Sequence, residues 1–155
     1  MTSTVGSATL TVTLTEAITL NGYDQGSTNT LTIASVNEVS KRIVTATTTE
    51  QEVLAFGTAV ASGTFLEDKV VYFRITNLAD TNHVVLTFKS EGNHEFAVKL
   101  DKGQSFIYNG DLAGGVVDTM DASASALSLA LEDLVNVTAD ADTASCDLEI
   151  FVACI

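Results

Sequence analysis

The sequence contains no proline and no tryptophan, and basic residues are few, the last of the seven being Lys102. Proline often protects the edges of sheets, so edge strands in this chain need shielding by charge, by loops or by a neighbouring subunit. Apolar runs fall well short of the about 18 residues that span a membrane. The N-terminal stretch MTSTVGSATL has no Lys or Arg and no continuous apolar segment. These absences predict neither a transmembrane segment nor a secretory signal.

The chain is strongly acidic, since 20 Asp and Glu side chains against 7 Lys and Arg give a formal net charge of −13. Proteins that bind nucleic acids or anionic membranes build their affinity from positive charge, which is scarce here. We therefore predict no nucleic-acid partner and no membrane partner. Acidity of this kind keeps a protein soluble and makes its copies repel one another.

The two cysteines, Cys146 and Cys154, lie in a segment that alternates like a β-strand. The strand between them spans about 26 Å, whereas a disulfide needs Cα atoms within about 7 Å of each other. We therefore predict two free and buried thiols, as in a protein that folds in a reducing cytoplasm.

The segment from Lys69 to Leu100 organises the predicted fold. It contains three β-branched and aromatic runs, KVVYFRITNL, HVVLTFK and HEFAVKL, separated by two clusters of turn-forming residues. This pattern predicts consecutive antiparallel strands joined by short hairpin loops. Alternation places Val84, Leu86 and Phe88 on one face, together with the apolar residues of the third run. The first two runs are apolar on both faces, which indicates the centre of a sandwich.

Further strands are expected on both sides of this segment, with about 8–10 strands in total. Their predicted ranges are 8–20, 28–35, 37–49, 52–56, 105–109, 134–140 and 146–155. The last two are expected to form a hairpin. Residues 125–134 are favoured as extended, with a helix as the alternative because Ala and Leu are good helix formers. The sequence thus predicts an all-β fold, a jelly-roll-like antiparallel β-sandwich in a single domain spanning residues 1–155. Residues 1–7 are expected to form a flexible or partner-bound arm, and residues 110–126 a long loop.

Residue types that serve catalysis or metal binding occur, but not in patterns that define a site. His83 and His94 have no further Cys or His ligands at zinc-site spacing. The acidic turn around Asp140, Asp142 and Asp147 does not match the calcium-binding loop, so a solvated turn is the favoured interpretation. No nucleophile, metalloprotease or phosphate-binding motif is present. We predict no catalytic residue, no metal site, no cofactor and no enzymatic activity.

Four segments, residues 42–57, 70–82, 96–108 and 147–154, resemble small virion-type proteins of tailed bacteriophages, especially marine and cyanobacterial phages. The motifs that carry the resemblance are Y-x-R-I-T-N before a short polar turn and then K-L-x-x-G-x-S-F. The resemblance implies a β-sandwich structural protein of the virus particle, made and assembled in the cytoplasm of the host bacterium. It implies a decoration or cement protein that binds and stabilises the outside of the phage head, with a tail, fibre or adaptor subunit as the alternative.

The partners expected from this resemblance are the major capsid protein or another virion protein. A homo-oligomer is also expected, with a trimer favoured because capsid lattices offer threefold positions. Interfaces favour apolar or small side chains in regions of low charge, such as the strand up to Leu20 and the loop 110–126. The candidate interface residues are Leu10, Val12, Leu14, Leu112, Val116, Val117 and Met120. The alternative is that the loop folds over one end of its own sandwich.

A different class of function also stays open, namely a carbohydrate-binding module on a jelly-roll scaffold. Lectins and capsid proteins share this architecture. The candidate ligands for a sugar are the loop carboxylates of Asp111, Asp118 and Asp121.

Overall fold

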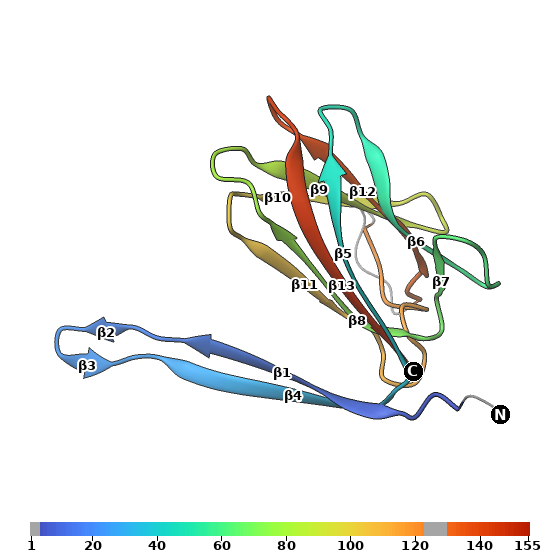
Figure 1. Cartoon of the computed structure of the whole chain (residues 1–155), viewed down its shortest axis with the longest axis horizontal. Helices are drawn as coiled ribbons and strands as arrows, with labels where there is room; N and C mark the ends of the chain where they lie inside the picture. Colours follow the sequence, from blue (N-terminus) through green and yellow to red (C-terminus); the bar gives the residue numbers. More distant parts are fainter. Residues whose placement is uncertain (1–3, 123–129) are drawn as a thin grey trace.

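The computed structural model describes residues 4–122 and 130–155, and it is an all-β sandwich with a long hairpin projecting from one end (Figure 1). The prediction of an all-β sandwich is therefore confirmed. The described residues contain no helix that is long and apolar enough to cross a membrane.

Two sheets form the sandwich, and the projecting hairpin forms a third layer. The five-stranded sheet has the order β10 (Glu95–Leu100), β9 (Val84–Ser90), β12 (Leu134–Ala141), β6 (Gln51–Gly57) and β7 (Thr64–Leu66). The four-stranded sheet has the order β11 (Ser105–Asn109), β8 (Val70–Asn77), β13 (Cys146–Cys154) and β5 (Glu38–Ala46). The hairpin comprises β1 (Ala8–Glu16), β2 (Thr19–Leu20), β3 (Tyr23–Asp24) and β4 (Ser27–Val36). Neighbouring strands are antiparallel except β6 and β7, which are parallel.

An aromatic cluster fills the space between the two sheets. The ring of Phe88 on β9 stacks on Phe96 of β10 with centroids 4.6 Å apart, and Phe106 of β11 lies 4.8 Å from it. On the opposite sheet, Phe73 stacks on Tyr108 at 5.1 Å. Aromatic rings bury large apolar areas, so this cluster supplies much of the stabilisation of the sandwich. The predicted faces of β9 and β10 are confirmed, because Phe96 pairs directly with Phe88.

Two predicted hairpins are wrong. The strands β8 and β9 follow each other along the chain but belong to different sheets, and the same holds for β12 and β13. The connections 78–83 and 142–145 therefore cross from one sheet to the other. Within the sandwich, β9 and β10 are a consecutive pair that does form an antiparallel hairpin. The apolar character of β8 on both faces follows from this topology, because one face meets the core and the hairpin packs over part of the other.

The projecting hairpin, which we call the arm (residues 8–36), has a turn that the sequence specifies. Asn21 and Gly22 both have positive φ, 51° and 83°, which matches the Asn-Gly type I′ turn of two-residue hairpins. The strand predicted from residue 8 to 20 pairs with β4 of the same chain, with Val12 opposite Leu31. A hairpin of residues 8–36 thus projects from the sandwich, whereas the arm predicted for residues 1–7 lies partly outside the described residues.

The base of the arm packs on the four-stranded sheet through a second apolar cluster, separate from the aromatic core. Its buried members are Ile33, Val36, Val71, Tyr72 and Ala153. The opposite face of the arm is a ladder of exposed threonines on β1 and β4, because side chains alternate along each strand. The arm is therefore apolar toward the sandwich and polar toward water.

The long loop after β11 is fastened to the end of the sandwich. A side chain at Gly115 would meet the backbone of Glu67 at 2.1 Å, so only glycine fits there, and its φ is +66°. Val116 donates a backbone hydrogen bond to Glu67 at 2.7 Å. Met120 pairs through its backbone with Glu132. Of the predicted strand 125–134, residues 125–129 lie outside the described residues.

The two cysteines are free and buried, as predicted. They lie at the two ends of β13. Burial raises the pKa of the Cys154 thiol to about 12.

Candidate interaction surface

The outer half of the arm exposes apolar side chains. Leu14, Ile18, Leu20 and Tyr23 are 50%, 56%, 58% and 73% exposed, respectively. Leu20 and Tyr23 are paired across the β2–β3 turn, so they lie on the same face of the tip. In Figure 1 the arm leaves the sandwich at its base and leads away from it, so the tip lies apart from the rest of the described residues. Each strand of the arm also has one edge without a strand partner, among the residues the structure describes.

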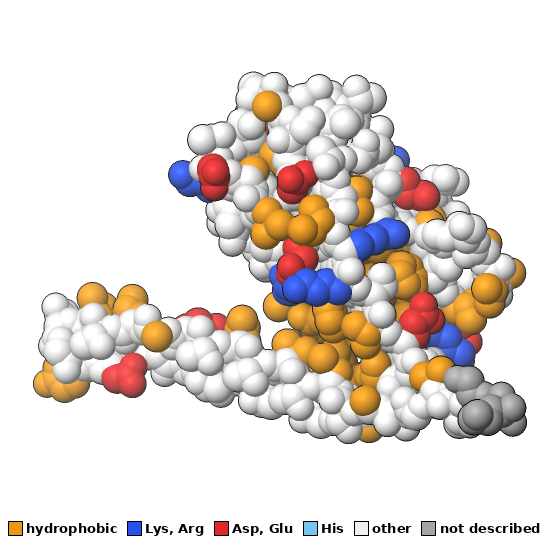
Figure 2. Space-filling view, viewed as in Figure 1, with side chains coloured by type: hydrophobic (Ala, Val, Ile, Leu, Met, Phe, Trp, Pro, Cys, Tyr) orange, Lys and Arg blue, Asp and Glu red, His pale blue; other side chains and the backbone are white. Residues whose placement is uncertain are grey.

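An open groove lies between the arm and the four-stranded sheet. Its volume is about 380 Å³. It is lined by Val12, Leu14, Asn29, Thr30, Leu31, Tyr72, Ile107 and Asn109, none of which carries a charge at neutral pH. Figure 2 shows hydrophobic side chains gathered where the arm meets the sandwich. The groove continues the apolar contact at the base of the arm, and it opens where the arm diverges from the sheet.

Beyond the groove, the outer face of the four-stranded sheet, directed away from the five-stranded sheet, also exposes apolar residues. On the edge strand β5, Val39 is 56% exposed and Ile43 is 64% exposed. Lys41 lies between them and pairs with Phe151 of β13, whose side chain is partly buried. The outer face is thus apolar in patches on both sides of Lys41.

The charges on this outer face are unbalanced toward positive near its centre. Glu149 accepts from Arg74 Nη2 at 2.6 Å and from Lys41 Nζ at 3.1 Å. The Arg74 guanidinium, followed by the Lys41 ammonium, holds the pKa of Glu149 below its ordinary value. Two cations therefore share one carboxylate. The other carboxylate on this face, Asp147, lies near the far end of the strand and accepts a hydrogen bond from Thr45.

The arm carries a small negative charge, opposite to that of the cations at the centre of this face. Its charged side chains are Glu16 and Asp24. Glu16 accepts from the Ser27 hydroxyl at 2.7 Å, and Asp24 accepts from the Gly26 backbone at 2.8 Å. These bonds hold the two carboxylates close to the tip without neutralising them.

The candidate interface residues from the sequence fall into two groups. Leu10, Val12 and Leu14 share the sheet-facing side of the arm, and only Leu14 among them is largely exposed. In the loop, Leu112 is 56% exposed and Val117 is partly buried. The structure does not bring the two groups together, since the arm and the loop pack into separate apolar clusters.

Two of the loop candidates need correction. Val116 is 0% exposed and Met120 is 2% exposed, and both belong to the core between the sheets. Residues 110–122 of the loop therefore fold over one end of the sandwich, in line with the alternative interpretation. The physical reason is the tight approach of Gly115 to Glu67, which draws the loop against the body.

Other apolar residues of this surface were missed, namely the exposed Ile18, Tyr23, Val39 and Ile43 and the partly buried groove residue Ile107. Val39 and Ile43 alternate with Ser40 and Arg42, so neither face of β5 is uniformly polar, and that mixed pattern was the available signal. Arg42 points to the other side, where it donates to the backbone oxygen of Val53 at 2.7 Å.

Ser90, His94 and Glu132 form a hydrogen-bonded cluster near the loop. The hydroxyl of Ser90 donates to the carboxylate of Glu132, and His94 Nδ1 lies 2.8 Å from the same carboxylate. In a nucleophilic Ser–His pair the imidazole contacts the hydroxyl, whereas here the ring of His94 contacts Glu132, which accepts from Ser90. The bonds from Ser90 and His94 hold the pKa of Glu132 below its ordinary value, and Glu132 raises the pKa of His94. The cluster ties the β9–β10 hairpin to the segment before β12.

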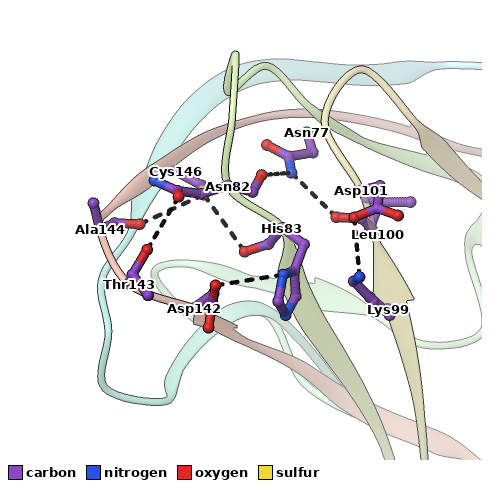
Figure 3. A network of polar contacts seen from close by, with 10 residues as sticks. All are labelled: Asn77, Asn82, His83, Lys99, Leu100, Asp101, Asp142, Thr143, Ala144 and Cys146. Carbon is purple, nitrogen blue, oxygen red and sulfur yellow. Dashed lines mark hydrogen bonds and ion pairs between the residues drawn. The ribbon is translucent and has the colours of Figure 1, made fainter.

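The two histidines lie at opposite ends of this hairpin, because Val84 pairs with Leu100 and Lys89 pairs with Glu95. His83 instead lies beside Asp142, with 3.7 Å between Nδ1 and the carboxylate (Figure 3).

A buried asparagine joins the loops at the His83 end of the sandwich (Figure 3). The side chain of Asn77 is fully buried and donates to the backbone oxygens of Asn82 at 2.9 Å and Leu100 at 3.1 Å. Its own oxygen accepts from the backbone of Ala79 at 3.0 Å. Every polar atom of this amide thus serves a connection between the two sheets.

The loop carboxylates considered as sugar ligands do not form one site. Asp111 accepts a hydrogen bond from Ala113 within its own turn, and the backbone of Asp118, at a positive φ of 52°, donates to Asp133. Within residues 4–122 and 130–155, no group of three or more His, Cys, Asp or Glu side chains is placed to hold a metal ion.

No family model matches this chain, and no curated protein matches its sequence. It is similar in structure to a protein solved in work titled "Bacillus endospore appendages form a novel family of disulfide-linked pili". The TM-score is 0.43 and the sequence identity is 10%, over 99% of this chain and 95% of that chain. A likeness at this level says nothing about function.

Proposed function

We propose that this chain is a non-enzymatic structural subunit of a virus particle, held in the assembly by its arm. The observation that carries the proposal is the projecting hairpin, whose outer half exposes Leu14, Ile18, Leu20 and Tyr23. An isolated two-stranded hairpin is at best marginally stable in water. A partner surface that covers the tip removes these side chains from water and fixes the hairpin.

The resemblance to phage proteins supports the proposal that this assembly is a virus particle. Within the virion, the position we propose is the outside of the head, where the chain binds the major capsid protein or another shell protein and reinforces the shell. Binding there uses surface complementarity and no chemistry. The polar clusters around Ser90 and Asn77 are compatible with this, because their hydrogen bonds hold loops in place.

Mass spectrometry of purified virus particles, produced from the genome that encodes this chain, tests the proposal. We expect the chain in intact particles, and its absence would overturn the proposal. Electron microscopy of particles carrying a labelled chain then locates it. Label over the head supports a decoration protein, whereas label on the tail supports the tail, fibre or adaptor alternative.

The role of the arm is tested by replacing Leu20 and Tyr23 with serine. Both side chains are exposed, so the fold is expected to survive. We expect the variant to be lost from particles, while a control with serine at Thr11 and Thr13, on the polar face of the arm, is retained. Equal incorporation of both variants contradicts a role for the arm.

A further inference from the structure

The tip of the arm points away from its own sandwich, so whatever covers it comes from another molecule (Figure 1). The apolar residues beyond Leu14 extend the arm by about 20 Å, given the rise per residue of a strand. The same chain has an uncovered surface of matching character in the outer face around Val39 and Ile43, together with the groove beside Ile107.

We propose that the arm tip of one copy docks on the outer face of the four-stranded sheet of a second copy, against Val39, Lys41 and Ile43. This rests on the proposed function and names the partner of the arm within the assembly. Leu20 and Tyr23 supply the apolar contact from the tip. Phe151, beside Lys41, continues the apolar surface on the receiving sheet.

Charge complementarity favours a second copy as the occupant. The tip carries Glu16 and Asp24 and no basic residue. The centre of the receiving face has the cations Lys41 and Arg74 with the single carboxylate Glu149 between them. This face holds two of only seven basic residues in a chain of net charge −13. Two copies of this acidic chain repel each other overall, so a contact between the acidic arm and the cationic centre of this face is favoured over contacts between acidic surfaces.

The geometry of this contact limits the symmetry of the assembly. The tip and the outer face are different surfaces, so one contact is heterologous and leaves a free tip and a free face. Two copies close the contact by exchanging arms, and three or more close it as a ring. In each case every tip is covered by a neighbouring sheet.

Photo-cross-linking tests the contact directly. Tyr23→Cys carries a benzophenone maleimide, which is directed to position 23 because Cys146 and Cys154 are buried. The labelled chain is mixed with an unlabelled copy of heavy nitrogen isotope, so that cross-links between copies are distinguished by mass. We expect cross-links to the β5 peptide that contains Lys41 and Ile43. Thr13→Cys, on the polar face of the arm, is the matched control and should give few.

Light scattering supplies the second measurement. The wild-type chain is expected to be larger than the 16.3 kDa monomer. Serine at Val39 and Ile43, or at Leu20 and Tyr23, should raise the dissociation constant of the oligomer by about tenfold or more, because buried apolar anchors dominate binding. Lys41→Glu should weaken it as well.

The two proposals fail in different ways. If the tip variant is lost from particles but the Val39 and Ile43 variant is retained, and no β5 cross-link forms, the arm binds a different protein and the inference is overturned. If the tip variant also decorates particles normally, the proposed role of the arm falls with it. Loss of both variants together with a β5 cross-link supports the inference.

Discussion

Replacing Met120 by alanine is expected to destabilise the sandwich, whereas the same replacement at Leu112 leaves its stability almost unchanged. Both residues lie in the long loop between β11 and β12. Met120 is 2% exposed and packs among the residues between the two sheets, while Leu112 is 56% exposed. The comparison therefore separates a loop that completes the core from a loop that serves as a contact surface.

The magnitude follows from burial. Truncating a buried Met, Leu or Ile to alanine costs about 2–5 kcal/mol, comprising the lost transfer free energy and the cavity left behind. For a domain of this size, each kcal/mol lowers the midpoint of thermal unfolding by about 2–4 °C, so Met120→Ala should lower it by about 4–20 °C. An exposed substitution such as Leu112→Ala is expected to change the free energy of unfolding by less than about 0.5 kcal/mol.

Urea and thermal unfolding followed by circular dichroism measure both variants, and light scattering measures their assembly in parallel. The backbone pairing of residue 120 with Glu132 persists in the alanine variant, so the effect isolates the side chain. The reasoning is refuted if Met120→Ala unfolds at the wild-type midpoint but dissociates the oligomer. That result would make Met120 a contact residue.

Three further predictions follow from polar and titratable groups. His94 has a raised pKa and Glu132 a lowered one, so the pair stabilises the fold most between about pH 4.5 and 6.5. This stabilisation is lost as the pH rises through the folded pKa of His94, and also as it falls through the folded pKa of Glu132. His94→Gln should remove the loss on the alkaline side, which unfolding measured from pH 6 to 9 checks. Cys146 and Cys154 should give two free thiols per chain in denatured, non-reduced protein, and both should react slowly in the native state. Fewer than two free thiols would contradict the absence of a disulfide between them. Asn77→Ala should cost about 1–3 kcal/mol for each buried carbonyl left without a donor, and an unchanged urea midpoint would show that water replaces the amide.

The sequence was informative about which strands exist and which faces they bury. In the hairpin of β9 and β10, alternation alone places Phe88 and Phe96 on the same face, because a one-residue shift would turn every apolar side chain to the other face. Their direct pairing is set by the register of the hairpin. The Asn21-Gly22 turn was equally local, since it depends on residues that tolerate positive φ.

The alternation of apolar and polar residues could not assign the strands to sheets. A short polar turn after β8 or β12 looks the same whether the next strand pairs in the same sheet or crosses to the facing one. What decides is long-range contact: β13 pairs with β8 on one side and with β5 on the other, far away in sequence. The burial of Met120 is also a long-range effect, because it depends on the fit of Gly115 against Glu67.

The candidate interaction surface was half predictable for a related reason. The low charge of the N-terminal strand pointed to the arm, where Leu14 is exposed. The proposed receiving face was not predicted, because Val39 and Ile43 look like ordinary inward residues of a strand. Only the position of β5 at the edge of its sheet, with the arm packing elsewhere, leaves them uncovered.

Separation of charge along the chain explains how an acidic protein can carry an adhesive arm. Without Glu16 and Asp24, the net charge of −13 leaves −11 on the rest of the chain, so sandwiches that approach each other closely repel. The outer half of the arm reaches about 20 Å beyond Leu14, which exceeds twice the Debye length of about 8 Å at physiological salt. In the proposed contact, the tip would join two copies while solvent and ions screen most of the repulsion between their bodies. The same repulsion disfavours contacts that bring two bodies together without the arm.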